Sequence, residues 1–144
     1  MKANRTYKRT YFLGKLKENL HSFSGRRKEN RAERLYTLIH RDDILRNALY
    51  EVSTNQGGMT SGVFDLNKLN FTVNHLNKIK GKLRNANYEP KPIRRVYIPK
   101  PDGGERPLGI PDFEDRVVQQ AVLSVIEPIC EGKFYPYNCG FRSS

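Results

Sequence analysis

The sequence has no tryptophan, and among its 144 residues it has only two cysteines and three histidines. Cys130 and Cys139 cannot be combined with the histidines into the ligand spacing of a zinc site. Two isolated thiols are instead typical of a reducing compartment. The sequence therefore predicts a cytoplasmic protein, bacterial or alternatively organellar, whose cysteines are reduced. We expect this chain to hold no metal and no cofactor.

Long hydrophobic runs are also missing. The longest apolar stretch, residues 121–126, is interrupted by Ser124, whereas a membrane-spanning helix needs about 20 apolar residues. The basic amino terminus lacks the apolar segment of a secretory signal. These absences predict a protein without a membrane partner. A chain of this length can instead bury one hydrophobic core.

Acidic residues are scarce, because 26 Lys and Arg stand against 15 Asp and Glu and give a net charge of +11. Residues 1–46 hold 13 basic against 5 acidic residues, whereas residues 94–144 hold seven of each. This balance indicates a polyanionic partner. A basic tail that only keeps the protein in solution is the alternative interpretation.

The basic segment, residues 1–31, has aromatic residues among its cations. Such aromatics can stack on exposed bases while the charges follow phosphates. A short helix over residues 11–20, packed on the body through its apolar side, is an equal alternative. The aromatic residues are Tyr7, Tyr11, Phe12 and Phe23.

Three stretches have the apolar spacing of helices. Residues 35–52 predict two helices, with Asp42 as the cap of the second. Residues 66–83 predict one amphipathic helix of about five turns. Asp112 predicts the cap of a third stretch, which has a continuous apolar stripe. That stripe is made of Val117, Val118, Ala121, Val122, Val125, Ile126 and Ile129.

The adjacent Asp42 and Asp43 invite comparison with the metal-binding Asp pair of polymerases. The polymerase pair follows an aromatic residue in a turn between strands. In this sequence His40 and Arg41 precede the two aspartates. A helix amino terminus, which favours negative charge, explains both acids. We therefore predict no metal site in this chain.

The stretch RRVYIPKPDGGERPLGIP, residues 94–111, predicts a β-hairpin, because two extended runs flank a turn that contains glycine. A two-residue loop would place Lys100 opposite Glu105. A loop with an odd number of residues, with a glycine in a bulge, would place Lys100 beside Arg106 and Ile98 beside Leu108. Apolar cross-strand pairs favour the second register.

The favoured register brings two cations together at the tip of the hairpin. Both charged groups can simply point into water. Alternatively, a polyanion lies between them, because a flexible Lys and a forked Arg beside a glycine-rich turn suit phosphate oxygens.

The block RRVYIPKPDGGERPLGIPDFEDRVVQQAVLSVIEPICEGKFYP, followed by GFR, resembles the first conserved block and the start of the second in group II intron reverse transcriptases, also called intron maturases. The resemblance covers residues 88–141 without a gap. It joins a hairpin, a helix and a Gly-Phe-Arg segment in the order of that family. A weaker match, NQGGMTSGV at residues 55–63, resembles the preceding block, which lies over the template strand.

In that family the hairpin belongs to the fingers, which close over the template and the incoming nucleotide. The resemblance implies that Lys100 and Arg106 hold the triphosphate of the dNTP. It implies packing against the template and the nascent base pair for Arg94, Pro99, Leu108 and Ile110. It also implies contacts with the RNA backbone for Arg116, Gln120 and Arg142.

The resemblance further implies an α+β fold, with helices around one hairpin, as the fingers part of a right-hand polymerase whose palm and thumb are absent here. We expect a basic extension at residues 1–31 and the fingers region at residues 32–144. RNA-directed DNA synthesis, primer DNA and Mg²⁺ are expected only with the palm, whose carboxylates hold two metal ions. This chain alone should not polymerise.

A self-standing intron-RNA-binding module that assists splicing is the alternative function. CRISPR-associated and diversity-generating reverse transcriptases are alternative relatives. A reading frame that continues into a Tyr-x-Asp-Asp motif would favour the polymerase.

Overall fold

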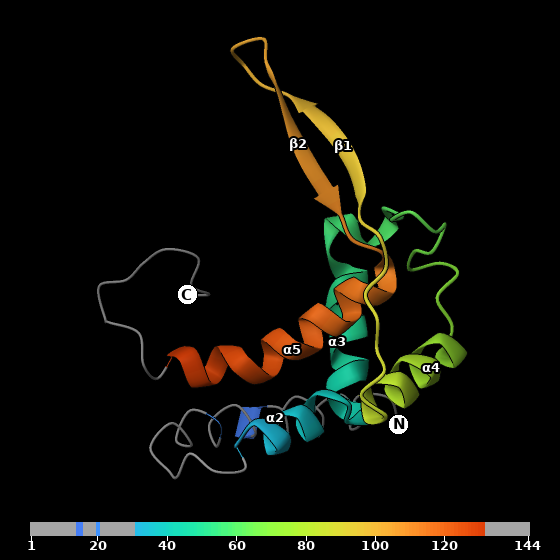
Figure 1. Ribbon diagram of the computed structural model, residues 1–144, viewed down its shortest axis with the longest axis vertical. Coiled ribbons are helices and arrows are strands. Elements are labelled where there is room, and N and C mark those ends of the chain that lie inside the picture. The colour runs from blue at the N-terminus through green and yellow to red at the C-terminus, as the bar shows by residue number, and fades with distance from the viewer. Residues whose placement is uncertain (1–13, 16–19, 21–30, 132–144) are drawn as a thin grey trace, which may run out of the picture.

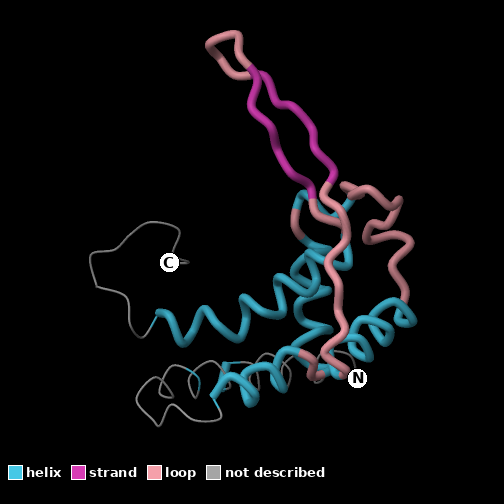
Figure 2. The backbone as a smooth tube through the Cα atoms, viewed as in Figure 1, coloured by secondary structure: helices cyan, strands magenta, loops and turns pink. Residues whose placement is uncertain are grey.

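The computed structural model describes residues 14–15, 20 and 31–131 of the protein (Figure 1). Within this part the fold is α+β, as predicted, because four α-helices accompany one antiparallel hairpin. Figure 2 shows the hairpin rising from a base of helices. The elements are α2 (Arg31–Ile39), α3 (Asp42–Thr54), the 3-10 helix η2 (Gln56–Met59), α4 (Val73–Arg84), β1 (Arg94–Pro99), β2 (Glu105–Ile110) and α5 (Phe113–Glu131).

Several predictions fall outside the described residues. They concern nearly all of the basic extension, together with Cys139, Arg142 and the Gly-Phe-Arg segment. None of the helices in the described part combines the length and the apolarity that crossing a bilayer requires.

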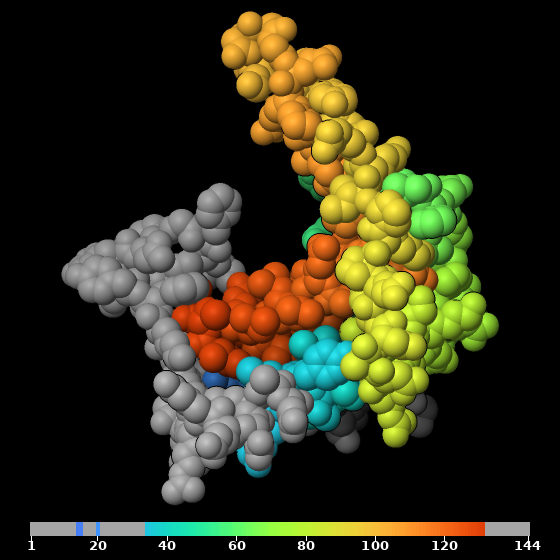
Figure 3. Space-filling view, viewed as in Figure 1, coloured from blue at the N-terminus to red at the C-terminus, as the bar shows by residue number. Residues whose placement is uncertain are grey.

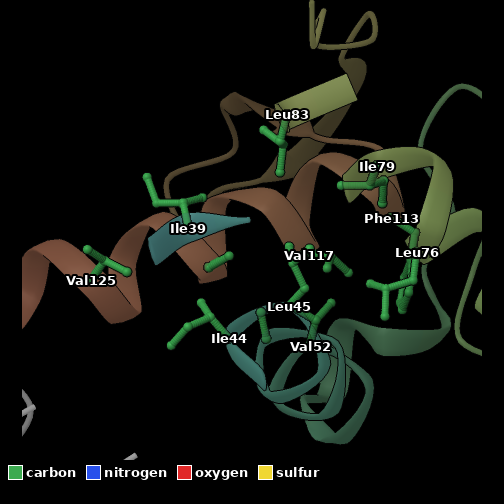
Figure 4. Packing of buried hydrophobic residues seen from close by; sticks show 12 residues of the cluster. Ile39, Ile44, Leu45, Val52, Leu76, Ile79, Leu83, Phe113, Val117 and Val125 are labelled. Carbon is green, nitrogen blue, oxygen red and sulfur yellow. The ribbon is translucent and has the colours of Figure 1, made fainter. Parts of the chain in front are cut away.

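The core lies where α3 and α5 cross and pack against each other, with α2 and α4 against their sides (Figure 4). Apolar side chains at helical spacing supply it, so the amphipathic pattern of the sequence determines which faces meet. Its buried members are Ile39, Ile44, Leu45, Ala48, Val52, Leu76, Ile79, Leu83, Phe113, Val117, Ala121 and Val125.

The apolar stripe of α5 faces this core, as predicted, with one exception. Val117, Ala121 and Val125 are fully buried, whereas Ile126 is 43% exposed. Phe113, the first residue of the helix, is also fully buried and contacts the ring of Phe71. The helix is therefore anchored in the core from its first residue, next to the hairpin.

The predicted pair of helices over residues 35–52 is confirmed, but Asp42 is not the cap. Arg41 occupies the cap position, and Asp42 lies with Asp43 in the first turn of α3. The Asp43 carboxylate accepts hydrogen bonds from the Arg41 guanidinium and from the Ile44 amide. Both acids therefore lie where the helix dipole favours negative charge.

The next helix begins later than predicted. The pattern over residues 66–83 predicts a helix from Leu66, whereas α4 begins at Val73. Side chains of Asn67 and Asn70 bond to nearby backbone groups and hold the preceding segment in turns. Thr72 and His75 then form a capping box that starts the helix.

The hairpin has a loop with an odd number of residues, as predicted, but the predicted register is wrong. Ile98 lies opposite Arg106, and Val96 lies opposite Leu108. The Lys100 amide donates to the Gly104 carbonyl at 2.7 Å, so three residues form the loop. Gly103 has a φ of 83°, which a side chain rarely adopts, and this allows the shorter loop.

Candidate nucleic-acid interface

Each face of the hairpin has a distinct composition. Directly opposed residues of an antiparallel pair lie on the same face, so the observed register gathers the even-numbered residues on one face. We call this the cationic face of the hairpin. It carries Arg94, Val96, Ile98, Lys100, Arg106, Leu108 and Ile110.

Two cations lie near the tip of the cationic face, and a third, Arg94, lies opposite Ile110 at its base. Lys100 and Arg106 are both exposed, and they are diagonal rather than direct neighbours near the tip. Diagonal residues on one face are about 7–8 Å apart, within reach of long side chains. Leu108 is 44% exposed, and Ile110 lies nearer the helical base. The face thus has two positive charges at the tip, apolar surface below them and one further cation at the base.

The register separates one predicted template residue from the others. Arg94, Leu108 and Ile110 share the cationic face with Lys100 and Arg106, but Pro99 pairs with Glu105 on the opposite face. The opposite face also carries Arg95, Tyr97, Pro107 and Gly109.

A buried cluster at the base of the hairpin anchors β1 to the start of α5. Lys91 Nζ is 2.8 Å from Asp112 Oδ2 and 2.9 Å from Glu114 Oε2. The Lys91 amide donates to Asp115 Oδ2 at 3.0 Å. The Tyr88 hydroxyl donates to the other oxygen of the same carboxylate at 2.5 Å. These contacts fix the segment that leads into β1 and therefore the position of the hairpin.

Burial and hydrogen bonding together shift the pKa values of groups in this cluster. Asp112 is fully buried, whereas 27% of the Lys91 side chain is exposed. Burial alone would lower the pKa of Lys91, but hydrogen bonds to Asp112 and Glu114 outweigh it and raise the pKa above its usual value. Burial and the hydrogen bond to Asp115 together raise the pKa of Tyr88 well above its ordinary range.

The loop at residues 55–62 is held against the same end of α5. Arg116 donates from Nη1 to the Gly57 carbonyl at 2.6 Å and from Nη2 to the Thr60 carbonyl. Gly62 lies so close that a Cβ there would be 2.6 Å from Asp112 Cα. Burial lowers the pKa of Arg116, and the nearby Asp112 carboxylate opposes that shift. The loop and the hairpin are thus both attached to the first turns of α5.

Gln120 also makes an internal contact, because its amide donates to Glu51 Oε2 of α3 at 2.5 Å. Arg116 and Gln120 nevertheless line a groove of about 510 Å³ between the end of α3, the 55–62 loop and α5. Contact with an RNA backbone stays a prediction for both residues. In Figure 3, the hairpin and α5 leave an open space between them on one side of the molecule.

The structure offers no alternative centre for a metal ion in the part of the chain that it describes. No three His, Cys, Asp or Glu side chains come together there in a suitable arrangement. The Asp42 carboxylate binds Lys80 Nζ at 2.8 Å, and the hydrogen bond to that lysine lowers the pKa of Asp42.

No pattern in the sequence indicates the roles of Tyr88 and Lys91. Both lie between α4 and β1, in a segment whose prolines indicate only extended backbone. The prediction of Asp112 as a helix cap agrees with the start of α5 at Phe113 but leaves out the long-range partner of this carboxylate. Only the spatial proximity of residues 88–91 and 112–115 reveals the cluster.

The cluster predicts a loss of stability at alkaline pH. Because the folded state raises the pKa of Tyr88, the stability that this group contributes is complete below about pH 10 and declines as pH rises above it. Lys91, with its raised pKa, loses its contribution in the range above 10.5. Urea unfolding at pH 8 and about pH 11 should show a smaller pH-dependent loss for Tyr88→Phe than for the unmodified chain. Tyr50→Phe, at a 63% exposed tyrosine, is the control and should leave the loss unchanged. Equal losses in all three proteins would contradict the assignment.

No protein-family model matches the chain, but several curated proteins do. The chain is 40% identical over 115 residues to protein YkfC of Escherichia coli, covering 78% of this chain and 30% of that protein. It is 38% identical over 110 residues to the group II intron-encoded protein LtrA of Lactococcus lactis, covering 76% of this chain and 18% of that protein. It is 33% identical over 105 residues to a 91 kDa protein in a cob intron of Schizosaccharomyces pombe, covering 73% of this chain and 13% of that protein.

These matches confirm the predicted resemblance to intron-encoded proteins over most of the chain. The chain spans less than a third of the length of each of these relatives.

Proposed function

We propose that this chain, a homologue of the group II intron-encoded proteins, forms the fingers part of an RNA-directed DNA polymerase. The cationic face of the hairpin carries the proposal. Its tip presents Lys100 and Arg106 to the triphosphate of the incoming dNTP, and its apolar part packs on the template and the nascent base pair. A guanidinium and an ammonium that share one face can bind several phosphate oxygens at once.

The packing contacts are assigned to Arg94, Leu108 and Ile110. Pro99 lies on the opposite face, so we do not include it in the surface that contacts the base pair. The 55–62 loop would lie over the template, and Arg116 would support that loop through its bonds to Gly57 and Thr60.

Nucleotidyl transfer would require the rest of the enzyme. The chemistry needs carboxylates that hold two divalent metal ions around the reacting oxygens. We assign these carboxylates, Mg²⁺ and the primer DNA to a palm outside this chain. This chain alone should therefore be inactive as a polymerase. Intron RNA is the proposed template and partner.

A chimera tests the proposal. The homologous segment of the Lactococcus protein is replaced by this chain, and primer extension on an RNA template is measured. We expect extension by the chimera and none by this chain alone. A chimera that folds, as judged by circular dichroism and gel filtration, but cannot extend a primer would contradict the proposal. Salt-sensitive RNA binding by such a chimera would favour the splicing-assistance module instead.

A further inference from the structure

The exposed surface of α4 is unusually basic and is not part of the hairpin site. The helix has the sequence VNHLNKIKGKLR, which has four cations and no acidic residue. In Figure 1, α4 lies at the opposite edge of the helical base from the carboxyl end of α5. Hydrophobic packing therefore uses one side of α4 and leaves its basic side to solvent.

Helical geometry arranges this basic side in a regular way. Leu76, Ile79 and Leu83 are buried, and at 100° per residue Gly81 lies directly opposite them. Asn74 and Asn85 lie beside Gly81, and both are exposed. We call these three residues the crest of α4.

Cations flank the crest on both sides. Lys78 and Lys82 follow one flank, and Lys80 and Arg84 follow the other. Lys80 binds Asp42 only through an exposed ion pair, which a phosphate could replace. Two rows of positive charge about one helix diameter apart, with amides between them, form a surface complementary to two phosphate strands.

Gly81 is the observation that points to close contact with a partner. Glycine is among the poorest helix formers, and nothing lies within 4 Å of the position that a Cβ would occupy. Packing within the protein therefore does not require a glycine there. A partner that approaches the helix backbone would require a glycine, because a side chain at the crest would hold that partner away.

The end of α4 shows a second position at which the choice between glycine and alanine does not follow backbone conformation. The helix ends at Asn85, and Ala86 adopts the left-handed conformation with a φ of 53°. Its amide bonds to the Leu83 carbonyl, and the Asn87 amide bonds to the Lys82 carbonyl. This ending normally has glycine at the position of Ala86. The helix thus has glycine at an exposed interior position, and alanine where the fold favours glycine. Such local violations are expected at functional sites.

We propose that the basic side of α4 binds double-stranded RNA across its minor groove. The A-form minor groove is wide and shallow and displays 2′-hydroxyl groups, which asparagine amides can bind. The flanking cations would contact the phosphates of the two strands. Lys80 and Arg84 also line a hollow of about 560 Å³, but the carboxylates of Asp42 and Asp43 line it too, so we assign the phosphate contacts to α4 alone.

The first test measures affinity and stability together. The full chain is titrated with a fluorescent RNA duplex of about 20 base pairs, without nucleotide or primer, so the result does not depend on the proposed polymerase. Gly81→Ala should raise the melting temperature by about 2–6 °C and yet weaken duplex binding at least about 5-fold. Ala86→Gly, the control, should also raise the melting temperature but leave the affinity unchanged. Unchanged affinity of the Gly81→Ala variant would overturn the proposal.

The second test uses the salt dependence of binding. The double variant Lys78→Ala/Lys82→Ala should lower the slope of log affinity against log salt by about 1.5–2, because two phosphate contacts are lost. Arg34→Ala/Arg46→Ala removes two exposed helical cations elsewhere and should leave the slope unchanged. An equal loss in the control pair would overturn the proposal, and so would equally tight binding of duplex DNA or of single-stranded RNA.

Discussion

Replacing Lys91 by methionine should cost the protein about 3 kcal/mol of unfolding free energy, the lower end of the range for breaking a buried ion pair. Asp112, fully buried, would lose its only side-chain partner among the described residues, while Glu114 would lose an ion pair at 2.9 Å. The lower end applies because 27% of the Lys91 side chain is exposed. Urea unfolding at pH 7, followed by circular dichroism, measures the loss.

Lys80→Met is the matched control. It also removes a lysine that binds an aspartate at 2.8 Å, but 36% of Lys80 and 61% of Asp42 are exposed. Exposed pairs contribute about 0.2–1 kcal/mol, so the control should change the stability little. If both variants lost the same amount, Lys91 would be an ordinary surface lysine and the hairpin would have another anchor.

The position of the hairpin was the part of the fold that the sequence could not predict. Local patterns predicted the hairpin, the helix after it and the side of that helix that is buried. The angle between them depends on Lys91 and Tyr88, which meet the carboxylates of Asp112, Glu114 and Asp115 across more than 20 residues of sequence. Pairing at such a separation leaves no periodic signal in a single sequence.

The register of the hairpin shows a different limit. Apolar pairing favoured Ile98 beside Leu108, but Ile98 lies opposite Arg106. A buried face determines register strongly and an exposed face does so weakly. Both faces of this hairpin are largely exposed, so the turn decides, and Gly103 allows the shorter three-residue loop. The odd loop length still placed Lys100 and Arg106 on the same face.

Residues that the sequence places outside an apolar stripe need not point into solvent. Arg116 and Gln120 lie off the stripe of α5, and the resemblance implied contacts with RNA. The structure shows Arg116 on the carbonyls of the 55–62 loop and Gln120 on Glu51. Long polar side chains beside a core can hold neighbouring loops, and for these two residues contact with RNA stays a prediction beside that structural role.

In the active chimera, Arg106→Ala should lower kcat/KM for the incoming nucleotide about 10–150-fold. This range corresponds to the loss of a charge-assisted hydrogen bond, about 1.5–3 kcal/mol. Arg106→Lys should restore the rate only partly, because an ammonium cannot reproduce the fork of the guanidinium. Single-nucleotide incorporation under pre-steady-state conditions measures both effects.

The opposite face of the hairpin supplies the control for this experiment. Arg95→Ala removes an arginine from the same exposed hairpin, but Arg95 pairs with Gly109 and points away from the cationic face. This variant should leave kcat/KM unchanged if the cationic face holds the triphosphate, and the affinity for template RNA should be the same in both variants. Unaltered incorporation by Arg106→Ala, together with weaker RNA binding, would assign the hairpin tip to general contacts with a phosphate backbone. An RNA-binding module would then describe this hairpin better than the fingers of a polymerase.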